Sequence, residues 1–365
     1  MTMIEFDPLE LYTRLRRWGL KPVQMQAAAA AMAADPRIVL LRVTQVQREG
    51  LVVHDGHGER PARLLPGLRH ALHDEADAIA CGDWVLARDD GHGTLWAHAR
   101  LSPLTQLARR LHDGRDKVER VVIVSNVDTA LLVMGLDGDF SLRRLERFIA
   151  LVRMAGVEPV VALTKADLCT DAAARRQAVV ALVGPAVPVL ALDARTPAAA
   201  AALAPWLLEG HTLVLAGSSG AGKSTLTNTL TGEAVADTGG QRRGDGRGRH
   251  TTTVRTLHGT PQGACVIDTP GLRTLRLDGD AGALQAVFDD IATLAPHCRV
   301  RDCRHEEEPG CAVREAVPAA RLKNFHKLQR EARRDQATAL ERKAEVAQWK
   351  TRARSARARM AAKRG

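Results

Sequence analysis

The sequence of 365 residues has no apolar run of the roughly 18 to 20 residues that a membrane-spanning helix needs. Its first thirty residues lack the basic stretch and the following apolar stretch of an export signal. Cysteines are few: of the six, three are scattered and three lie close together beside a histidine. That distribution favours a reducing compartment with one metal site over a framework of disulfides. We therefore expect a cytoplasmic protein with no membrane partner.

Most of the chain lacks an excess of charge of either sign, because the net charge of +10 comes from one end. Residues 321–365 hold 15 Lys or Arg and 4 Asp or Glu, a balance of +11, which leaves about −1 for the other 320 residues. Hydrophobic residues make up 45% and charged residues 26%, as in soluble globular proteins, and the length allows two or three domains. The basic end indicates a polyanion such as RNA as partner; a solvated, Ala-rich helical tail is the alternative.

No internal repeat is evident, and the apolar pattern divides the chain into five parts. Residues 1–36 are expected to form a helical extension. In residues 37–107, Gly-rich turns separate most of the short β-prone runs, and the third connection is the longest. This pattern predicts a small closed barrel, with the oligonucleotide-binding (OB) type as the leading candidate and another small barrel as the alternative. The β-prone runs are 38–45, 50–55, 60–65, 83–88 and 94–99.

In residues 108–282 strands and helices alternate, which predicts a multidomain α/β protein whose second domain is a parallel sheet with helices on both faces. Ser141 can cap a helix in which Leu142, Leu145, Phe148 and Val152 recur at helical spacing. The predicted strands of this part are 129–134, 158–163, 188–192 and 212–216.

A phosphate-binding loop follows the last of these strands. The glycines let backbone N–H groups curl around a β-phosphate, Lys223 can reach the β- and γ-phosphates, and the Ser224 hydroxyl can bind Mg²⁺ at a helix N-terminus. A chance match is improbable because the flanking strand and helix are both in place. The nucleotide-binding residues expected here are Gly217, Ser218, Ser219, Gly220, Ala221, Gly222, Lys223, Ser224 and Thr225.

A second nucleotide motif, Asp-Thr-Pro-Gly, follows the apolar run 264–267. Asp268 at a strand end can hold Mg²⁺ through water, and the Gly271 N–H can sense the γ-phosphate. Alone the tetrapeptide would be an ordinary turn. Residues 239–253 lie between the two motifs, have no periodicity and resemble a switch loop, in which Thr251 or Thr252 is expected to bind Mg²⁺.

The third motif, Thr164-Lys165-Ala166-Asp167, ends the strand 158–163 and indicates which base is bound. The Asp167 carboxylate can accept from both N1–H and the exocyclic amine of guanine, a pair that adenine lacks. A helix cap is the alternative for this tetrapeptide taken alone. The motif lies 58 residues before Lys223, whereas in ordinary GTPases it follows the phosphate loop. The chain is therefore circularly permuted, which a parallel sheet tolerates because the packed core is unchanged.

Cys298, Cys303, His305 and Cys311 form the pattern Cys-x4-Cys-x-His-x5-Cys. Three thiolates and one imidazole complete a tetrahedral set, which predicts a structural Zn²⁺ without an open position; free buried thiols are the alternative. Helical stretches at 283–295 and from 317 onward would be held by the metal. We assign 283–330 to a zinc-binding helical domain and 331–365 to a basic tail.

These motifs, in this order and after an OB-like barrel, resemble the ribosome small-subunit-dependent GTPase A (RsgA) family over residues 37–330. The likeness extends to Ser125-Asn126-Val127-Asp128 and to Arg301-Asp302-Cys303-Arg304-His305. It implies a slow GTPase that binds GTP and GDP and assists late maturation of the small (30S) ribosomal subunit. We expect the protein to be a monomer. The subunit and its 16S-type rRNA are then the partners, and subunit binding stimulates hydrolysis.

Two positions depart from the family pattern. Thr164 replaces an asparagine, so some hydrogen bonds that fix the loop must come from elsewhere. Residues 190–194 read Leu-Ala-Leu-Asp-Ala, where a Ser-Ala loop normally flanks the base.

Hydrolysis needs a group that orients the attacking water, and Leu272 stands where many GTPases have glutamine. His250, beside the switch threonines, is the catalytic candidate because imidazole can accept from water near neutral pH. A contact with RNA or solvent is the alternative for His250, and a ribosomal group could act instead. For the whole chain, a P-loop ATPase or kinase and a non-catalytic RNA-binding scaffold are the rival functions.

Overall fold

The computed structural model describes residues 7–74, 77–112, 118–236, 255–269 and 288–336. The chain separates into two compact units. Unit 1 contains Met1–Arg109 and Arg120–Leu275, and unit 2 contains Arg110–Glu119 and Arg276–Gly365. Among the described helices, none combines the length and the apolar character needed to cross a membrane.

Five strands of unit 1 close into a barrel in the order β1-β2-β3-β5-β4, with β4 pairing back to β1. All pairs are antiparallel except β3 with β5. Helix α3 (Pro66–Asp74) occupies the long third connection. The closed OB-like barrel is confirmed, and each strand begins and ends within about one residue of its predicted run. The strands are β1 (Ile38–Val46), β2 (Leu51–His54), β3 (Glu59–Leu64), β4 (Trp84–Asp89) and β5 (Leu95–Arg100).

Alternating side chains of the barrel face two different cores. Leu41 and Val43 of β1 point into the barrel, whereas Leu40 packs with helices α1 (Pro8–Arg16) and α2 (Pro22–Ala34) on its outside. The Asp7 carboxylate caps α1 by accepting the N–H groups of residues 9 and 10, and a proline stands at the first helical position. The expected helical extension therefore covers one side of the barrel.

The second part of unit 1 is a sheet in which β10, β9, β8, β11 and β13 run parallel in that order. Strand β12 (Thr256–Gly259) pairs antiparallel with β13 and also meets β1 of the barrel, where Gln45 is opposite Thr256. A separate ribbon of β6 (Gln106–His112) and β7 (Val118–Ser125) was not predicted from the sequence. The parallel strands are β8 (Thr129–Gly135), β9 (Glu158–Thr164), β10 (Val189–Ala191), β11 (Thr212–Gly217) and β13 (Cys265–Asp268).

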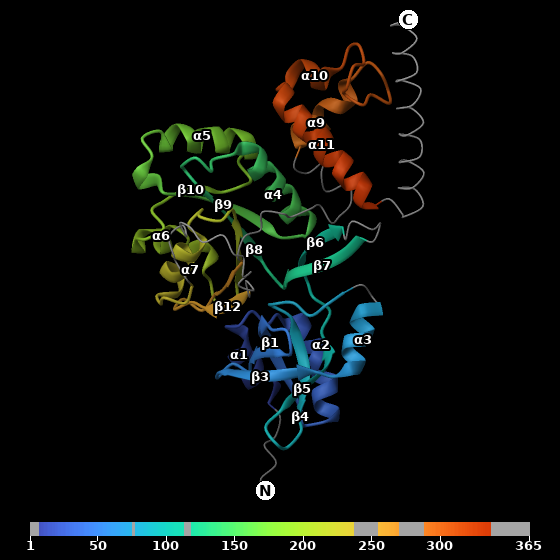
Figure 1. Ribbon diagram of the computed structural model, residues 1–365, viewed down its shortest axis with the longest axis vertical. Helices are drawn as coiled ribbons and strands as arrows, with labels where there is room; N and C mark the ends of the chain where they lie inside the picture. Colours follow the sequence, from blue (N-terminus) through green and yellow to red (C-terminus); the bar gives the residue numbers. More distant parts are fainter. Residues whose placement is uncertain (1–6, 75–76, 113–117, 237–254, 270–287, 337–365) are drawn as a thin grey trace, which may run out of the picture. The chain divides into compact units, whose positions relative to one another are not determined.

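Helices cover both faces of this sheet, as the alternating pattern predicts. Ser141 caps α4 by accepting the Arg144 N–H, and α4 contacts β8, β9 and α5. On the other face, α6 and α7 pack with each other over Leu131 and Val133 of β8 (Figure 1). The helices are α4 (Leu142–Met154), α5 (Ala172–Val183), α6 (Pro197–Ala202) and α7 (Lys223–Thr231), with short 3-10 turns at Ala166–Leu168 and Ala204–Trp206.

The barrel and the sheet are joined at Asn126, which follows β7. Its side chain accepts from the Gln24 amide and donates to the Gly82 carbonyl, both at 2.9 Å. The buried guanidinium of Arg42, on β1, donates to the Asn126 carbonyl at 3.1 Å and lies 5.0 Å from the Trp84 ring. This link gives the segment 125–128 a structural role at the junction of the barrel and the sheet.

Unit 2 is helical. Arg321 on α11 makes two hydrogen bonds to Asp290 on α9, at 2.6 and 2.8 Å, and the Phe288 and Phe325 rings meet edge to face. Of the helix expected over 283–295, the described part is α9 and one following 3-10 turn. The elements are α9 (Asp289–Leu294), η3 (Ala295–His297), α10 (Ala312–Ala316) and α11 (Ala319–Gln336).

A buried carboxyl beside the junction gives a pH-dependent prediction. Burial raises the pKa of Asp83 to about 6, although its Oδ2 accepts the Ala80 N–H at 2.8 Å and Arg100 lies 3.8 Å away. This value exceeds the roughly 3.9 of an unfolded aspartate, so the folded state binds the proton more tightly. The contribution of Asp83 to the unfolding free energy should rise by up to about 3 kcal/mol as the pH falls from about 6 to about 4.

Urea unfolding of the parent and of Asp83→Asn, at several pH values between 4 and 7, measures this contribution. The difference between parent and variant should shift in favour of the parent as the solution is acidified. A difference that stays constant with pH would contradict the assignment.

Candidate nucleotide site and metal centre

The phosphate-binding loop connects β11 to α7. At Gly217 a Cβ atom would collide with the Val133 carbonyl of the neighbouring strand, so only glycine fits. Gly222 caps α7 with φ = 92°, a left-handed conformation that favours glycine. The helix N-terminus therefore stands directly after a glycine-rich turn, which is the arrangement that binds phosphate.

Lys223 curls back over this loop. Its ammonium donates to the carbonyls of Gly217 and Ser218, at 3.1 and 2.7 Å, and the side chain is buried. A buried cation aimed at the inside of the loop can neutralise a phosphate that the loop encloses.

Ser224 and Asp268 meet beside the loop, at the ends of α7 and β13. The Ser224 hydroxyl donates to Asp268 Oδ2 at 3.4 Å, while Oδ1 is buried without a hydrogen-bond partner among the described residues. Burial raises the pKa of Asp268, and the nearby Lys223 ammonium partly opposes the rise. The adjacent Thr269 hydroxyl fixes the strand end by donating to the Leu215 carbonyl of β11. A hydroxyl and a carboxylate with a free oxygen fit the oxygen ligands that Mg²⁺ prefers.

The third motif lies beside the phosphate loop, at the end of β9. The buried Thr164 hydroxyl donates to the Ala221 carbonyl at 2.6 Å, so Thr164 itself supplies one of the loop-fixing bonds that the sequence left to other residues. Lys165 has φ = 59°, and its ammonium donates to Asp137 at 2.5 Å. That hydrogen bond lowers the pKa of Asp137.

Asp167 lies in the short turn after Lys165. Its Oδ2 accepts from the Arg195 guanidinium at 2.8 Å, and Arg195 is bound by Asp193 as well. The structure thus brings three predicted segments together: the phosphate loop, Asp268 and the loop 164–167. The remaining predicted residues of this site, His250, Thr251, Thr252 and Gly271, lie outside the described part of the chain.

The four predicted metal ligands of unit 2 also converge, with all ligand atoms within 4.8 Å of one another. The sulfurs of Cys298 and Cys311 are 3.8 Å apart, and His305 Nδ1 lies 3.6 and 3.4 Å from them. A tetrahedral ion with metal–sulfur bonds of about 2.3 Å and metal–nitrogen bonds of about 2.0 Å requires edges of roughly 3.5 to 3.8 Å. The three edges among Cys298, His305 and Cys311 therefore have about the lengths of a tetrahedral metal site, and the Cys303 sulfur lies within 4.8 Å of the other ligand atoms.

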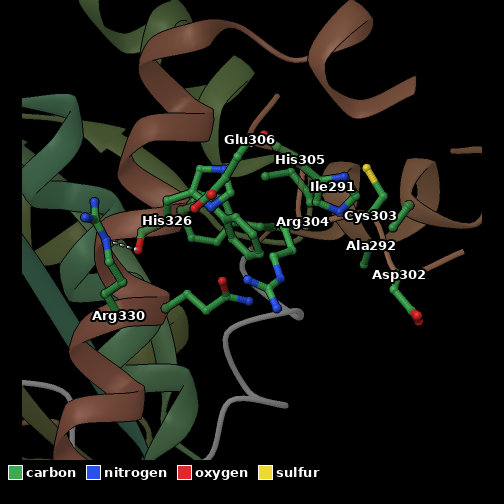
Figure 2. A pocket seen from close by; sticks show the side chains of 13 residues that line it. Ile291, Ala292, Asp302, Cys303, Arg304, His305, Glu306, His326 and Arg330 are labelled. Carbon is green, nitrogen blue, oxygen red and sulfur yellow. Dashed lines mark hydrogen bonds between the residues drawn. The ribbon is translucent and has the colours of Figure 1, made fainter. Parts of the chain in front are cut away.

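A cavity of about 370 Å³ adjoins this cluster (Figure 2). His326 on α11 bonds to the His305 carbonyl at 3.2 Å, which fixes the backbone of one metal ligand. The positive and negative side chains of the lining balance one another, so charge alone selects no ligand for the cavity. These side chains are Asp302, Arg304, Glu306 and Arg330.

Comparison with known proteins agrees with this geometry. A family model described as RsgA GTPase matches residues 104–278. A relative from Xylella fastidiosa (strain M23), "Small ribosomal subunit biogenesis GTPase RsgA", is 45% identical over 297 residues, which cover 80% of this chain and 87% of the relative. The chain belongs to the RsgA GTPase family. A relative of the same name from Xanthomonas oryzae pv. oryzae (strain PXO99A) is 42% identical over 84% of both chains.

Solved structures share the fold. YjeQ from Thermotoga maritima covers 81% of this chain and 98% of its own length, with a TM-score of 0.59 and 23% identity. YloQ, titled a circularly permuted GTPase, has a TM-score of 0.55, 24% identity and coverage of 81% and 95%. A second family model, described as ABC transporter, matches residues 206–360, a range that contains the phosphate loop but not residues 164–167.

Two residues that the sequence did not single out contact the loop 164–167. Asp137 follows β8 and binds Lys165, and Arg195 follows β10 and binds Asp167. Both come directly after parallel strands, whose ends meet at the edge of the sheet where ligands bind. A search for charged residues shortly after the predicted parallel strands would therefore have identified Asp137 and Arg195.

We predict that Thr164→Val, which keeps the shape and removes the hydroxyl, weakens both folding and nucleotide binding. The Ala221 carbonyl would lose its buried donor, which should lower the unfolding free energy by about 1 to 3 kcal/mol. Thr129→Val serves as control, because Thr129 is a buried threonine at the start of the neighbouring strand β8, at the end of the sheet away from the loop. Equal GTP affinity in the parent and in Thr164→Val would show that this hydrogen bond does not position the loop.

We also predict that Cys303→Ala abolishes metal binding in unit 2 and leaves nucleotide binding intact. Loss of one ligand of four opens the site, and the fold around it depends on the ion. Metal content by mass spectrometry and proteolysis within residues 288–330 are the measurements, with Cys169→Ala as the matched cysteine control. The prediction is wrong if the reduced parent carries no metal, or if Cys303→Ala keeps its full content.

Proposed function

We propose that this chain hydrolyses GTP to GDP and phosphate and acts in biogenesis of the small ribosomal subunit. The observation that carries the nucleotide chemistry is the hydrogen bond from Thr164 to Ala221, because it fixes a base-reading loop against a phosphate loop. The biological role is supported by the family relatives, whose name is small ribosomal subunit biogenesis GTPase RsgA. We infer that subunit binding stimulates a slow intrinsic reaction in late maturation.

The proposed binding residues divide by the part of GTP they contact. Residues 217–225 enclose the phosphates, with Lys223 compensating charge on the β- and γ-groups. Ser224, Thr251 or Thr252, and Asp268 hold Mg²⁺, which neutralises charge that develops on the phosphates. The Gly271 N–H contacts the γ-phosphate. Residues 164–167 take the base: Lys165 flanks it, and Asp167 accepts from the guanine edge.

We propose His250 as the residue that orients the attacking water, since Leu272 at the glutamine position can neither donate nor accept a hydrogen bond. A ribosomal group acting in place of His250 is the competing assignment. The test is His250→Ala, assayed with subunits present. Loss of stimulated turnover with unchanged GTP affinity would support His250, whereas undiminished turnover would favour the ribosomal group.

For the rest of the chain we propose Zn²⁺ as the ion of the Cys298–Cys303–His305–Cys311 cluster, because three thiolates and an imidazole suit a structural zinc. We also propose that the chain has five parts, which are a helical extension, an OB-like barrel, a permuted GTPase domain, a zinc-binding domain and a basic tail. Their boundaries lie at residues 36, 107, 282 and 330. We further propose a cytoplasmic monomer without a membrane partner. The barrel and the basic end contact 16S-type rRNA, since 321–365 carries a balance of +11.

A GTP hydrolysis assay with and without purified small subunits tests this function. We expect slow turnover alone, an increase of at least tenfold with subunits, and no turnover in Lys223→Ala under either condition. Faster hydrolysis of ATP than of GTP would favour an ATPase or kinase. Subunit binding without any turnover would favour a non-catalytic scaffold.

A further inference from the structure

Arg195 links two carboxylates at the base end of the nucleotide site. Its Nη2 lies 2.8 Å from Asp167 Oδ2 and 2.9 Å from Asp193 Oδ2, and its Nε lies 2.9 Å from Asp193 Oδ1. The fork thus holds Asp193 with two donors and shares one of them with Asp167. The positive charge of this guanidinium offsets the repulsion between the two carboxylates, which both bond to the same nitrogen.

The segment that carries Arg195 is fixed against the rest of the site. Asp193 accepts the Arg195 backbone N–H at 3.0 Å, which closes a tight turn after β10. The Ala194 carbonyl accepts from the Thr229 hydroxyl of α7 at 2.6 Å, and α7 is the helix that begins at the phosphate loop. The turn is therefore attached to the phosphate-binding helix, and from it the Arg195 side chain reaches Asp167.

Asp193 lies in the segment 190–194, where the resemblance to the family places a loop that flanks the base. An unpaired acid there would repel Asp167 and compete with it for the guanine donors. Hydrogen bonds from Arg195 lower the pKa of Asp193, so Asp193 is a charged and already occupied acceptor.

We propose that Arg195, anchored by Asp193, is a positioning residue that holds the Asp167 carboxylate for guanine and thereby sets base selectivity. The inference rests on the proposed GTP-binding function. A carboxylate has about four acceptor positions, so Asp167 can keep the Arg195 bond on Oδ2 and still accept N1–H and the exocyclic amine of guanine. Arg195 then restricts the rotation of Asp167 and removes a competing negative charge from the base site.

The test is equilibrium binding of GTP, GDP, XTP and ATP to the parent, Arg195→Ala, Asp167→Asn and the double variant. Arg195→Ala should weaken GTP and GDP about five- to tenfold, with little change for ATP, and so reduce the preference for guanine. In the Asp167→Asn background the same substitution should have almost no further effect on GTP, because the positioned carboxylate is already gone. Arg195→Lys should restore only part of the affinity, since an ammonium cannot hold both acids as a fork does.

The chain supplies a matched control in Arg37. Arg37 binds Asp35, two residues earlier, through the same three donors, its backbone N–H, Nε and Nη2, but far along the chain from the nucleotide motifs. Arg37→Ala should leave all four affinities unchanged. Thermal unfolding of both alanine variants shows whether each is folded.

The possible outcomes separate the inference from the function on which it rests. A folded Arg195→Ala that binds GTP as tightly as the parent, or more tightly, overturns the positioning role; tighter binding would mean that Arg195 competes with the base. Equal effects of Arg195→Ala in the parent and in Asp167→Asn also overturn it. A parent that does not prefer GTP over ATP instead contradicts the proposed function.

Discussion

Parallel pairing of β8, β9, β11 and β13 is the constraint on which the nucleotide site depends. Each strand ends at the same edge of the sheet. Asp137, the loop 164–167 and the phosphate loop follow three of these strands, and Asp268 is the last residue of the fourth. This pairing fixes which strands are neighbours in the sheet but not the order in which they occur along the chain. The loop 164–167 can therefore lie beside the phosphate loop although Lys165 precedes Lys223 by 58 residues, and hydrogen bonds from Thr164 to Ala221 and from Thr229 to Ala194 connect these segments.

A second constraint joins the barrel to this sheet. Arg42 is fully buried with Nε and Nη1 unpartnered among the described residues, which is costly, yet it contacts Trp84, the Asn126 carbonyl and Thr212 of β11. Strand β1 also pairs with β12, whose first residue, Thr256, follows the predicted switch threonines by a few positions. The barrel thus shares one continuous sheet with β11, which precedes the phosphate loop, and with β12, which follows the predicted switch threonines. If the barrel binds RNA as proposed, this sheet connects it to both strands.

The sequence predicted most of the fold, and the described segments of the predicted nucleotide site lie together, because both depend on local patterns. Barrel strands alternate with Gly-rich turns, the buried parallel strands are apolar runs, and the glycines of the phosphate loop and the cysteine spacing are short-range signals. The ribbon of β6 and β7 and the junction at Asn126 were missed, since no periodicity marks them and their partners lie far away in sequence. The link from Asp167 to Arg195 was missed for the same reason: 28 residues and a helix separate them.

The two departures from the family pattern have the same physical explanation. A threonine hydroxyl is shorter than an asparagine amide and offers one donor, yet Thr164 at the buried end of β9 is close enough to reach Ala221 directly. Asp193 brings a negative charge into the segment 190–194, yet Arg195 two residues later neutralises it within a closed turn. In each case the altered side chain satisfies its hydrogen-bonding groups inside the site. If Asp167 reads guanine as proposed, its position can be fixed by the hydrogen bonds of Thr164 and Arg195 without the asparagine and the serine that the resemblance leads one to expect.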